Sequence, residues 1–218
     1  MKREEIIGKI YEDKVIAIVR GIGSEPLLKL ANALYAGGIT MMEITFDQAR
    51  PETWDTTAAS IAFLRAQVGD HMAIGAGTVT SSYLVEKAVS AGAEYIISPD
   101  VQKEVIEKTK EMGAVSIPGA MTPTEVIAAY KYGADFVKIF PAANLGQKYI
   151  KALRGPINHI PLLAVGGVNE DNLKDFLEVG MIGAGVGGNL VNKKWIEEGE
   201  FDKITELARK YRCAAGNC

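Results

Sequence analysis

The chain has 218 residues, of which 48% are hydrophobic and 23% charged, and its net charge is −3 at pH 7. This length and composition predict one single domain, residues 1–218, with one large core. The near balance of 24 basic and 27 acidic residues, without basic blocks, argues against a surface for nucleic acid or for an anionic membrane. No apolar run approaches the roughly 18 residues of a membrane-spanning helix.

The two ends of the chain favour a cytoplasmic protein. The first residues, Met1-Lys-Arg-Glu-Glu-Ile-Ile, carry acidic side chains and lack the apolar centre of a signal peptide. Cys213 and Cys218 both lie near the C-terminus, where they cannot cross-link a core, and we expect them to be reduced thiols.

Helical and strand patterns alternate along the chain after a leading helix expected near residues 2–12. Glycines typical of helix C-termini precede strand-like runs, and Gly92, Gly113 and Gly133 recur about 20 residues apart. Residues 122–125, Thr-Pro-Thr-Glu, have the spacing of a capping box with proline at the first helical position. Strands are predicted near residues 15–20, 39–46, 72–76, 94–98, 115–118, 135–140, 161–165 and 181–187.

Eight strands alternating with helices imply a parallel sheet, which closes most simply into a (β/α)8 TIM barrel with an extra N-terminal helix. A doubly wound open sheet is the alternative. In such barrels the reacting groups lie at the C-terminal ends of the strands and in the loops that follow.

One lysine stands inside the sixth predicted strand, in the run Asp135-Phe-Val-Lys-Ile-Phe-Pro141. Strand alternation places Phe136, Lys138 and Phe140 on one face. Burial there lowers the pKa of the amine, so that the neutral form can attack a ketone. The structural alternatives are a lysine that reaches solvent from the strand end, or a buried ion pair with Glu43.

Other polar side chains are expected to converge with Lys138, because they end the first three strands. Arg20 suits a planar carboxylate, and its charge depresses the pKa of a nearby lysine. Glu43, which shares a face with Thr45, can move protons. Thr78 adds a hydroxyl within a glycine-rich turn. The set predicts Schiff-base chemistry on a small 2-keto acid.

Two glycine pairs follow the last two strands, Gly166-Gly167 and Gly187-Gly188. Glycine backbone can direct its N–H groups towards an anion, and the loops after strands seven and eight are the usual phosphate cradle of this architecture. The pairs therefore predict a phosphorylated substrate, with tight-turn glycines as the structural alternative.

We expect neither a metal nor a cofactor. A metal-dependent aldolase needs a cluster of ligands, whereas only His71 and His159 are present and both precede strands, away from the expected site. No Gly-x-Gly-x-x-Gly turn for a dinucleotide follows the first strand.

With these residues in place, the chain resembles the class I 2-keto-3-deoxy-6-phosphogluconate aldolases, a family that includes 4-hydroxy-2-oxoglutarate and 6-phosphogalactonate aldolases. The resemblance implies a (β/α)8 homotrimer, Lys138 as the Schiff-base residue, Glu43 as acid and base, Thr78 at the pyruvyl group, and the two glycine pairs at phosphate. Pro99 and Phe140 are expected either to line the pocket or to pack at the strand ends. The similar motifs are Met42-Glu-Ile-Thr45, Gly75-Ala-Gly-Thr-Val79, Ile97-Ser-Pro99, Ile117-Pro-Gly119, Val137-Lys-Ile-Phe-Pro141 and Gly166-Gly167.

Three positions depart from the gluconate type. Asp47, Val165 and Gly188 stand where an arginine, a threonine and a serine are usual, and Arg20 with Val165 is more similar to the galactonate type. The sequence therefore predicts cleavage of 2-keto-3-deoxy-6-phosphogluconate or -galactonate to pyruvate and glyceraldehyde 3-phosphate. The alternatives are an aldolase for non-phosphorylated 4-hydroxy-2-oxoglutarate, in which the two lost hydroxyls have dismantled the anion site, and a barrel that binds a sugar phosphate without catalysis.

Overall fold

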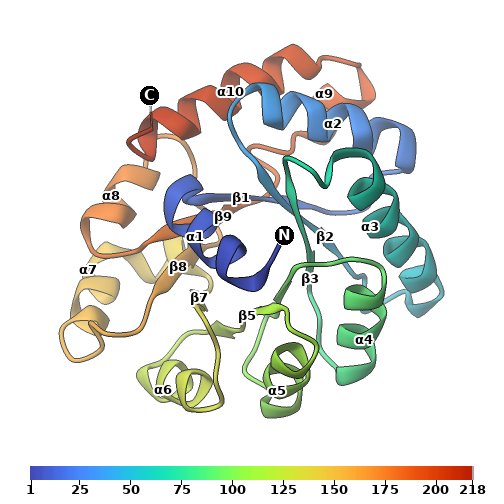
Figure 1. Ribbon diagram of the computed structural model, residues 1–218. Helices are drawn as coiled ribbons and strands as arrows, with labels where there is room; N and C mark the ends of the chain where they lie inside the picture. Colours follow the sequence, from blue (N-terminus) through green and yellow to red (C-terminus); the bar gives the residue numbers. More distant parts are fainter. Residues whose placement is uncertain (218) are drawn as a thin grey trace.

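The computed structural model describes residues 1–217, apart from the side chain of Ser24. A ring of parallel strands is surrounded by helices, and α1 lies across the centre of the ring (Figure 1). The strands are β1 (Val15–Val19), β2 (Met41–Thr45), β3 (Ala73–Gly77), β4 (Tyr95–Ile97), β5 (Val115–Ile117), β6 (Gly119–Ala120), β7 (Val137–Ile139), β8 (Leu162–Val165) and β9 (Gly183–Val186). The helices are α1 (Arg3–Asp13), α2 (Ser24–Ala36), the short 3-10 helix η1 (Pro51–Thr53), α3 (Trp54–Val68), α4 (Ser82–Ser90), α5 (Lys103–Glu111), α6 (Pro123–Lys131), α7 (Ala142–Arg154), α8 (Leu173–Glu178), α9 (Lys193–Glu197) and α10 (Phe201–Ala214).

The barrel is closed across a broken strand. The hydrogen-bonded order is β5-β4-β3-β2-β1-β9-β8-β7-β6, so β5 and β6 lie at the two ends of the order although only Pro118 separates them in the chain. Proline has no N–H for a ladder, and here it divides the fifth predicted strand into β5, which pairs with β4, and β6, which pairs with β7. The eight predicted strands thus appear as nine, and the (β/α)8 barrel with its N-terminal helix is confirmed.

The helix boundaries follow the local signals. Gly92, Gly113 and Gly133 have φ of +100°, +77° and +97° just after α4, α5 and α6, a conformation that favours glycine. At the start of α6 the expected capping box forms, because Thr122 N–H donates to Glu125 Oε2 at 2.7 Å and Glu125 N–H donates to Thr122 Oγ1 at 3.4 Å.

The N-terminal end of the barrel is plugged by apolar side chains. Ile6 and Ile10 of α1 are buried against inward-facing residues that include Tyr95 of β4 and Phe136, just before β7. Arg3 at the start of α1 pairs with Asp135, which also precedes β7. Apolar side chains therefore fill this end of the barrel, and the cavity lined by Lys138 lies at the opposite end.

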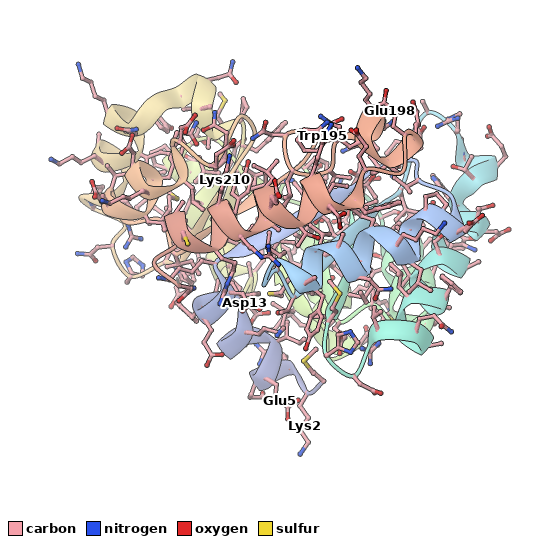
Figure 2. The ribbon with its side chains drawn as sticks, turned by 90° about the horizontal axis from the view of Figure 1, so that it is seen from above. Lys2, Glu5, Asp13, Trp195, Glu198 and Lys210 are labelled. Atoms are coloured by element: carbon pink, nitrogen blue, oxygen red, sulfur yellow. The ribbon has the colours of Figure 1, made fainter. Side chains whose placement is uncertain are left out.

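That opposite end carries α9. Figure 2 shows Trp195 and Glu198, in and just after α9, on the side of the molecule away from Lys2 and Glu5 at the start of α1. The outer layer is completed where α10 lies beside α2 (Figure 1), with Thr205 Oγ1 donating to the Ala33 carbonyl at 3.0 Å.

One cysteine near the C-terminus differs from the sequence prediction. Cys213, in α10, is disulfide-bonded, so the expectation of a reduced thiol is wrong for this residue. Cys218 lies outside the described residues.

Among residues 1–217, none of the helices combines the length and the hydropathy needed to cross a membrane.

Candidate active site

A cavity of about 730 Å³ opens at the C-terminal end of the barrel strands. It is lined by residues at or after the ends of β1, β2, β3, β4, β7, β8 and β9. All the site residues expected from the sequence line it: Arg20, Glu43, Thr78, Pro99, Lys138, Phe140, Val165, Gly166, Gly167, Gly187 and Gly188.

Lys138 occupies the floor of this cavity. It is the middle residue of β7, its side chain is 8% exposed, and its Nζ lies 5.3 Å from the centroid of the Phe140 ring. Burial lowers the pKa of the amine; the Glu43 carboxylate opposes this shift and the Arg20 guanidinium adds to it. Phe136 shares the inward face as expected, but it lies deeper, in the apolar plug.

Glu43 is the second group of the floor, on β2. It is 3% exposed, and burial raises the pKa of its carboxyl to about 7, against the opposing charges of Lys138 and Arg20. Within residues 1–217 its Oε2 has no hydrogen-bond partner, and no ion pair within 4.0 Å joins it to Lys138. The two groups interact through space while both face the cavity, which does not fit the alternative of a closed structural ion pair.

Two glycines of β3 make room for these groups. Gly75 is the register partner of Glu43, and a Cβ at Gly75 would come within 2.2 Å of the Tyr95 ring. A Cβ at Gly77 would come within 2.5 Å of Glu43 Oε1 and 2.9 Å of Thr45 Cγ2. The missing side chains thus let the carboxylate and a tyrosine share the interior of the barrel.

The rim near β1 to β3 carries Arg20 and Thr78. Arg20 is exposed at the end of β1, and its charge also helps to keep the pKa of Asp47 below its ordinary value, after the hydrogen bonds that Asp47 accepts from Arg50 and Ala49. The guanidinium therefore lies near enough to the cavity to act through space on Asp47, Glu43 and Lys138. Thr78 has φ of +56°, a conformation that is unusual for a β-branched residue. Its carbonyl accepts a 2.7 Å hydrogen bond from Gln48 Nε2, which helps to hold the turn.

The glycine pairs form the other side of the rim. Gly166 and Gly167 have φ of +92° and +75°, and a Cβ at Gly167 would lie 2.5 Å from the Ala143 Cβ. Among the described residues, the backbone N–H groups of Gly166, Gly167, Gly188 and Asn189 donate to no protein acceptor. These unused donors border the cavity, so this rim can receive an anion.

Some cavity residues were not anticipated from the sequence. The turn after β9 continues through Asn192 into Lys193 and Lys194, the first residues of α9, and all three line the cavity. The sequence does show a pair of lysines after a glycine turn. No helix was predicted there, however, so the two lysines were not assigned to the site. His71 and His159 precede β3 and β8 and lie outside the cavity as expected, where His71 makes a tilted ring contact with Tyr35 and His159 an edge-to-face contact with Tyr130.

Comparison with known proteins agrees with this geometry. The family model for KDPG and KHG aldolase matches residues 6–207. The protein of Haemophilus influenzae named 2-dehydro-3-deoxy-phosphogluconate aldolase is 32% identical over 208 residues, which are 95% of each chain. The protein of Escherichia coli K12 named 2-dehydro-3-deoxy-6-phosphogalactonate aldolase is 32% identical over 199 residues, 91% of this chain and 94% of the relative.

One similar solved structure contains a covalent reaction intermediate. The KDPG aldolase of Legionella pneumophila, with pyruvate captured at low pH as a covalent carbinolamine intermediate, superposes with a TM-score of 0.83 at 28% identity, over 93% of this chain and 96% of that one. The resemblance seen in the sequence motifs is confirmed by these matches.

Proposed function

The chain belongs to the KDPG and KHG aldolase family, and from this premise we propose that it is a class I aldolase that acts through a Schiff base on Lys138. Its substrate is a 2-keto-3-deoxy-6-phospho sugar acid of the gluconate or galactonate series, which it cleaves to pyruvate and glyceraldehyde 3-phosphate. The observation that carries the proposal is the buried amine of Lys138, whose pKa is lowered and which faces a cavity beside an unpaired carboxylate.

The chemistry begins when the neutral Lys138 amine attacks the C2 ketone. The carbinolamine that forms loses water to give an iminium, and the positive nitrogen then accepts the electron pair of the C3–C4 bond as that bond breaks. The C4 hydroxyl loses its proton and becomes the carbonyl group of the aldehyde, which then leaves. The enamine is protonated at C3, and water hydrolyses the resulting iminium to pyruvate and free Lys138.

Glu43 serves as the proton carrier of these steps. A carboxyl with a pKa of about 7 can exchange a proton in either direction at neutral pH, which is the range where general acid and base catalysis is most effective. Its unpartnered Oε2 is available to take the proton of the C4 hydroxyl and to assist the loss of water from the carbinolamine, directly or through one water molecule.

The substrate carboxylate is assigned to Arg20 and Thr78. The guanidinium can bind a carboxylate in a bidentate manner, and its charge acts through space on both Glu43 and Lys138. Thr78 lines the same cavity, and its hydroxyl is a second donor for the carboxylate. Pro99 and Phe140 are assigned to the apolar walls, and the glycine pairs to the phosphate.

A second candidate substrate is non-phosphorylated 4-hydroxy-2-oxoglutarate. The observation in its favour is that Val165 and Gly188, at the distal side of the cavity, offer no side-chain hydroxyl to an anion. We propose the phosphorylated substrate as the better one because Arg20 and Lys193 bring positive charge to the cavity, where Glu43 is the one acidic residue among the described lining residues. Measurement of kcat/KM for the phosphogluconate, phosphogalactonate and 4-hydroxy-2-oxoglutarate substrates ranks the three.

The Schiff base itself is tested by borohydride reduction in the presence of pyruvate, followed by mass mapping of peptides. We expect a reduced pyruvyl adduct on the peptide that contains Lys138, and none on the same peptide of a Lys138→Met variant. An unmodified Lys138 peptide in the wild-type protein contradicts the proposal and leaves a barrel that only binds sugar phosphates. Activity in excess chelator is expected to stay unchanged, since the iminium supplies the positive charge.

We further propose a homotrimer. Large apolar side chains are exposed around α6, namely Met121, Ile127, Tyr130 and Tyr132, each at least 37% exposed. Such a patch is commonly covered by a neighbouring subunit. Light scattering after size exclusion measures the mass directly, and a monomer contradicts the trimer.

A further inference from the structure

Lys193 stands between the cavity of Lys138 and a second cavity. The second cavity, of about 550 Å³, is bordered by the turn after β1 and by the region after α9, and Lys193 lines both. A Cβ at Gly21 would lie 3.9 Å from Lys193 Nζ. The ammonium therefore lies beside the turn that follows Arg20, although its own backbone belongs to α9.

Lys193 also differs from the lysine next to it. Nζ of Lys194 lies 3.9 Å from Glu198 Oε1, one turn further along the chain. The side chain of Lys193 is exposed and forms no hydrogen bond, ion pair or ring contact with any residue in 1–217. Glu25, Glu197 and Glu198 border the second cavity with it, but none of the described carboxylates lies within 4.0 Å of its Nζ. At this rim it is thus a positive charge without a direct acidic partner.

The same rim holds backbone donors that no protein group uses. The N–H groups of Gly188 and Asn189 are unpartnered among the described residues, and both residues line the cavity with Lys193. Backbone N–H groups alone bind an anion less strongly than N–H groups joined by a cation, since charge-assisted hydrogen bonds are roughly twice as strong as neutral ones.

We infer that Lys193 binds the phosphate of the substrate and so sets the preference for phosphorylated over non-phosphorylated substrates. Its ammonium supplies, from the loop after β9, the polar contact that side-chain hydroxyls do not supply at Val165 and Gly188. The inference rests on the proposed function, because it names a residue for the phosphate of that substrate. A phosphate monoester carries between one and two negative charges at neutral pH, which matches an unpaired cation beside open N–H groups.

The decisive variant is Lys193→Met, which keeps the length and apolar stem of the side chain and removes only its charge. For the phosphorylated substrate we expect KM to rise roughly 10-fold, as for the loss of one charge-assisted hydrogen bond, with kcat changed little. For the non-phosphorylated 2-keto-3-deoxy acid we expect no change in kcat/KM. Competitive inhibition by inorganic phosphate should weaken to a similar extent.

Two matched variants separate charge from structure. Lys194→Met removes the same charge from the adjacent residue, and we expect it to raise KM by less than about 3-fold, because that lysine has Glu198 nearby. Lys193→Arg restores the charge and is expected to recover most of the affinity. Equal effects of Lys193→Met on both substrates, no effect on either, or an equal effect of Lys194→Met overturns the inference.

Failure of the inference can be told apart from failure of the proposed function. If pyruvate is trapped on Lys138 and the substrate is cleaved, but Lys193→Met does not discriminate between the two substrates, only the role of Lys193 is wrong. If wild-type protein neither traps pyruvate nor cleaves the substrate, both fall together.

Discussion

Lys138 and Lys193 are lysines of the same cavity in opposite surroundings. Lys138 projects from a strand into the closed interior of the barrel and is 8% exposed, whereas Lys193 begins a short helix at the rim and is exposed. Desolvation lowers the pKa of the first, so it can act as a nucleophile, while the second is suited to hold a charged group. The comparison teaches that the depth of a side chain, rather than its type, distinguishes the bond-making role proposed for Lys138 from the binding role proposed for Lys193.

The same contrast separates the floor of the cavity from its rim. On the floor, Lys138 and Glu43 come from strands whose register is fixed by backbone hydrogen bonds. On the rim, Arg20, Thr78 and Lys193 follow or lie outside strands. Changes to the floor should therefore act mainly on kcat, and changes to the rim mainly on KM.

The largest effect is expected from Lys138→Met, which replaces the nucleophile by an apolar side chain of similar length. Without a Schiff base the reaction has no electron sink, and we expect kcat/KM to fall by roughly 10³-fold or more, equivalent to about 4 kcal/mol of barrier. Steady-state kinetics measures the loss, and an unchanged circular dichroism spectrum excludes unfolding as its cause. Residual activity within 10-fold of wild type contradicts the role of Lys138 as the nucleophile, and with it the contrast between Lys138 and Lys193.

Glu43→Gln is expected to lower kcat by about 10²- to 10⁴-fold with a smaller change in KM, because it removes proton transfer but keeps the size of the side chain. Reduction with borohydride should still trap pyruvate on Lys138, more slowly than in the wild type. A complete loss of trapping assigns Glu43 to carbinolamine formation, whereas an unchanged kcat contradicts its role as the proton carrier.

The stability of the protein should depend on pH through Glu43. A folded-state pKa of about 7, above the ordinary value of 4.5, means that the folded protein binds the proton more tightly than the unfolded chain. The resulting stabilisation is complete below pH 4.5 and is lost as pH rises to 7, on the order of 3 kcal/mol, since each tenfold difference in proton affinity is worth about 1.4 kcal/mol.

Urea unfolding of wild type and Glu43→Gln at several pH values between 4 and 8 measures this dependence. The free energy of unfolding of the wild type should fall relative to that of the variant between pH 4.5 and 7 and then level off. Parallel curves for the two proteins would mean that Glu43 is more hydrated in the folded protein than its burial indicates, so that its pKa is not raised.

The smallest effect is expected from Gly77→Ala, compared with Gly188→Ala. A Cβ at Gly77 collides with Glu43 and Thr45, whereas a Cβ at Gly188 has nothing within 4 Å. Overpacking of this kind costs about 1–3 kcal/mol, so Gly77→Ala should lower the melting temperature and kcat, while Gly188→Ala leaves the melting temperature unchanged. Thermal unfolding and kinetics of the two variants, measured side by side, sharpen the contrast between floor and rim.

Much of the fold followed from local patterns in the chain. Period-two alternation placed Lys138 and Glu43 on the inward faces of their strands, and glycines about 20 residues apart marked the ends of successive helices. The expected strands agree with the observed ones because apolar runs between turn residues have few other places to be buried. The break at Pro118 was not predicted, although its cause lies in the sequence, since proline has no N–H to donate to the ladder.

The candidate site was predictable where it depends on strand ends and not where it depends on distant loops. All eleven expected residues line one cavity, because parallel strands in a barrel bring their C-terminal ends together. Lys193 was missed, since its approach to Gly21 joins positions 172 residues apart in the chain. The two loops are neighbours because the barrel closes with β1 beside β9, and no spacing rule in the sequence specifies that approach.

By itself, the sequence determined the barrel, the strand positions of the proposed reacting groups Lys138 and Glu43, and the glycine turns, because each of these depends on hydrogen bonding and on the alternation of side chains within one segment. Only the tertiary structure decided that Glu43 stays unpaired, that Tyr95 packs over Gly75, and that an unpartnered lysine reaches the rim beside Gly21. The physical reason is desolvation: the loss of water around a charged group depends on every segment that closes over it, and that closure exists only in the folded chain.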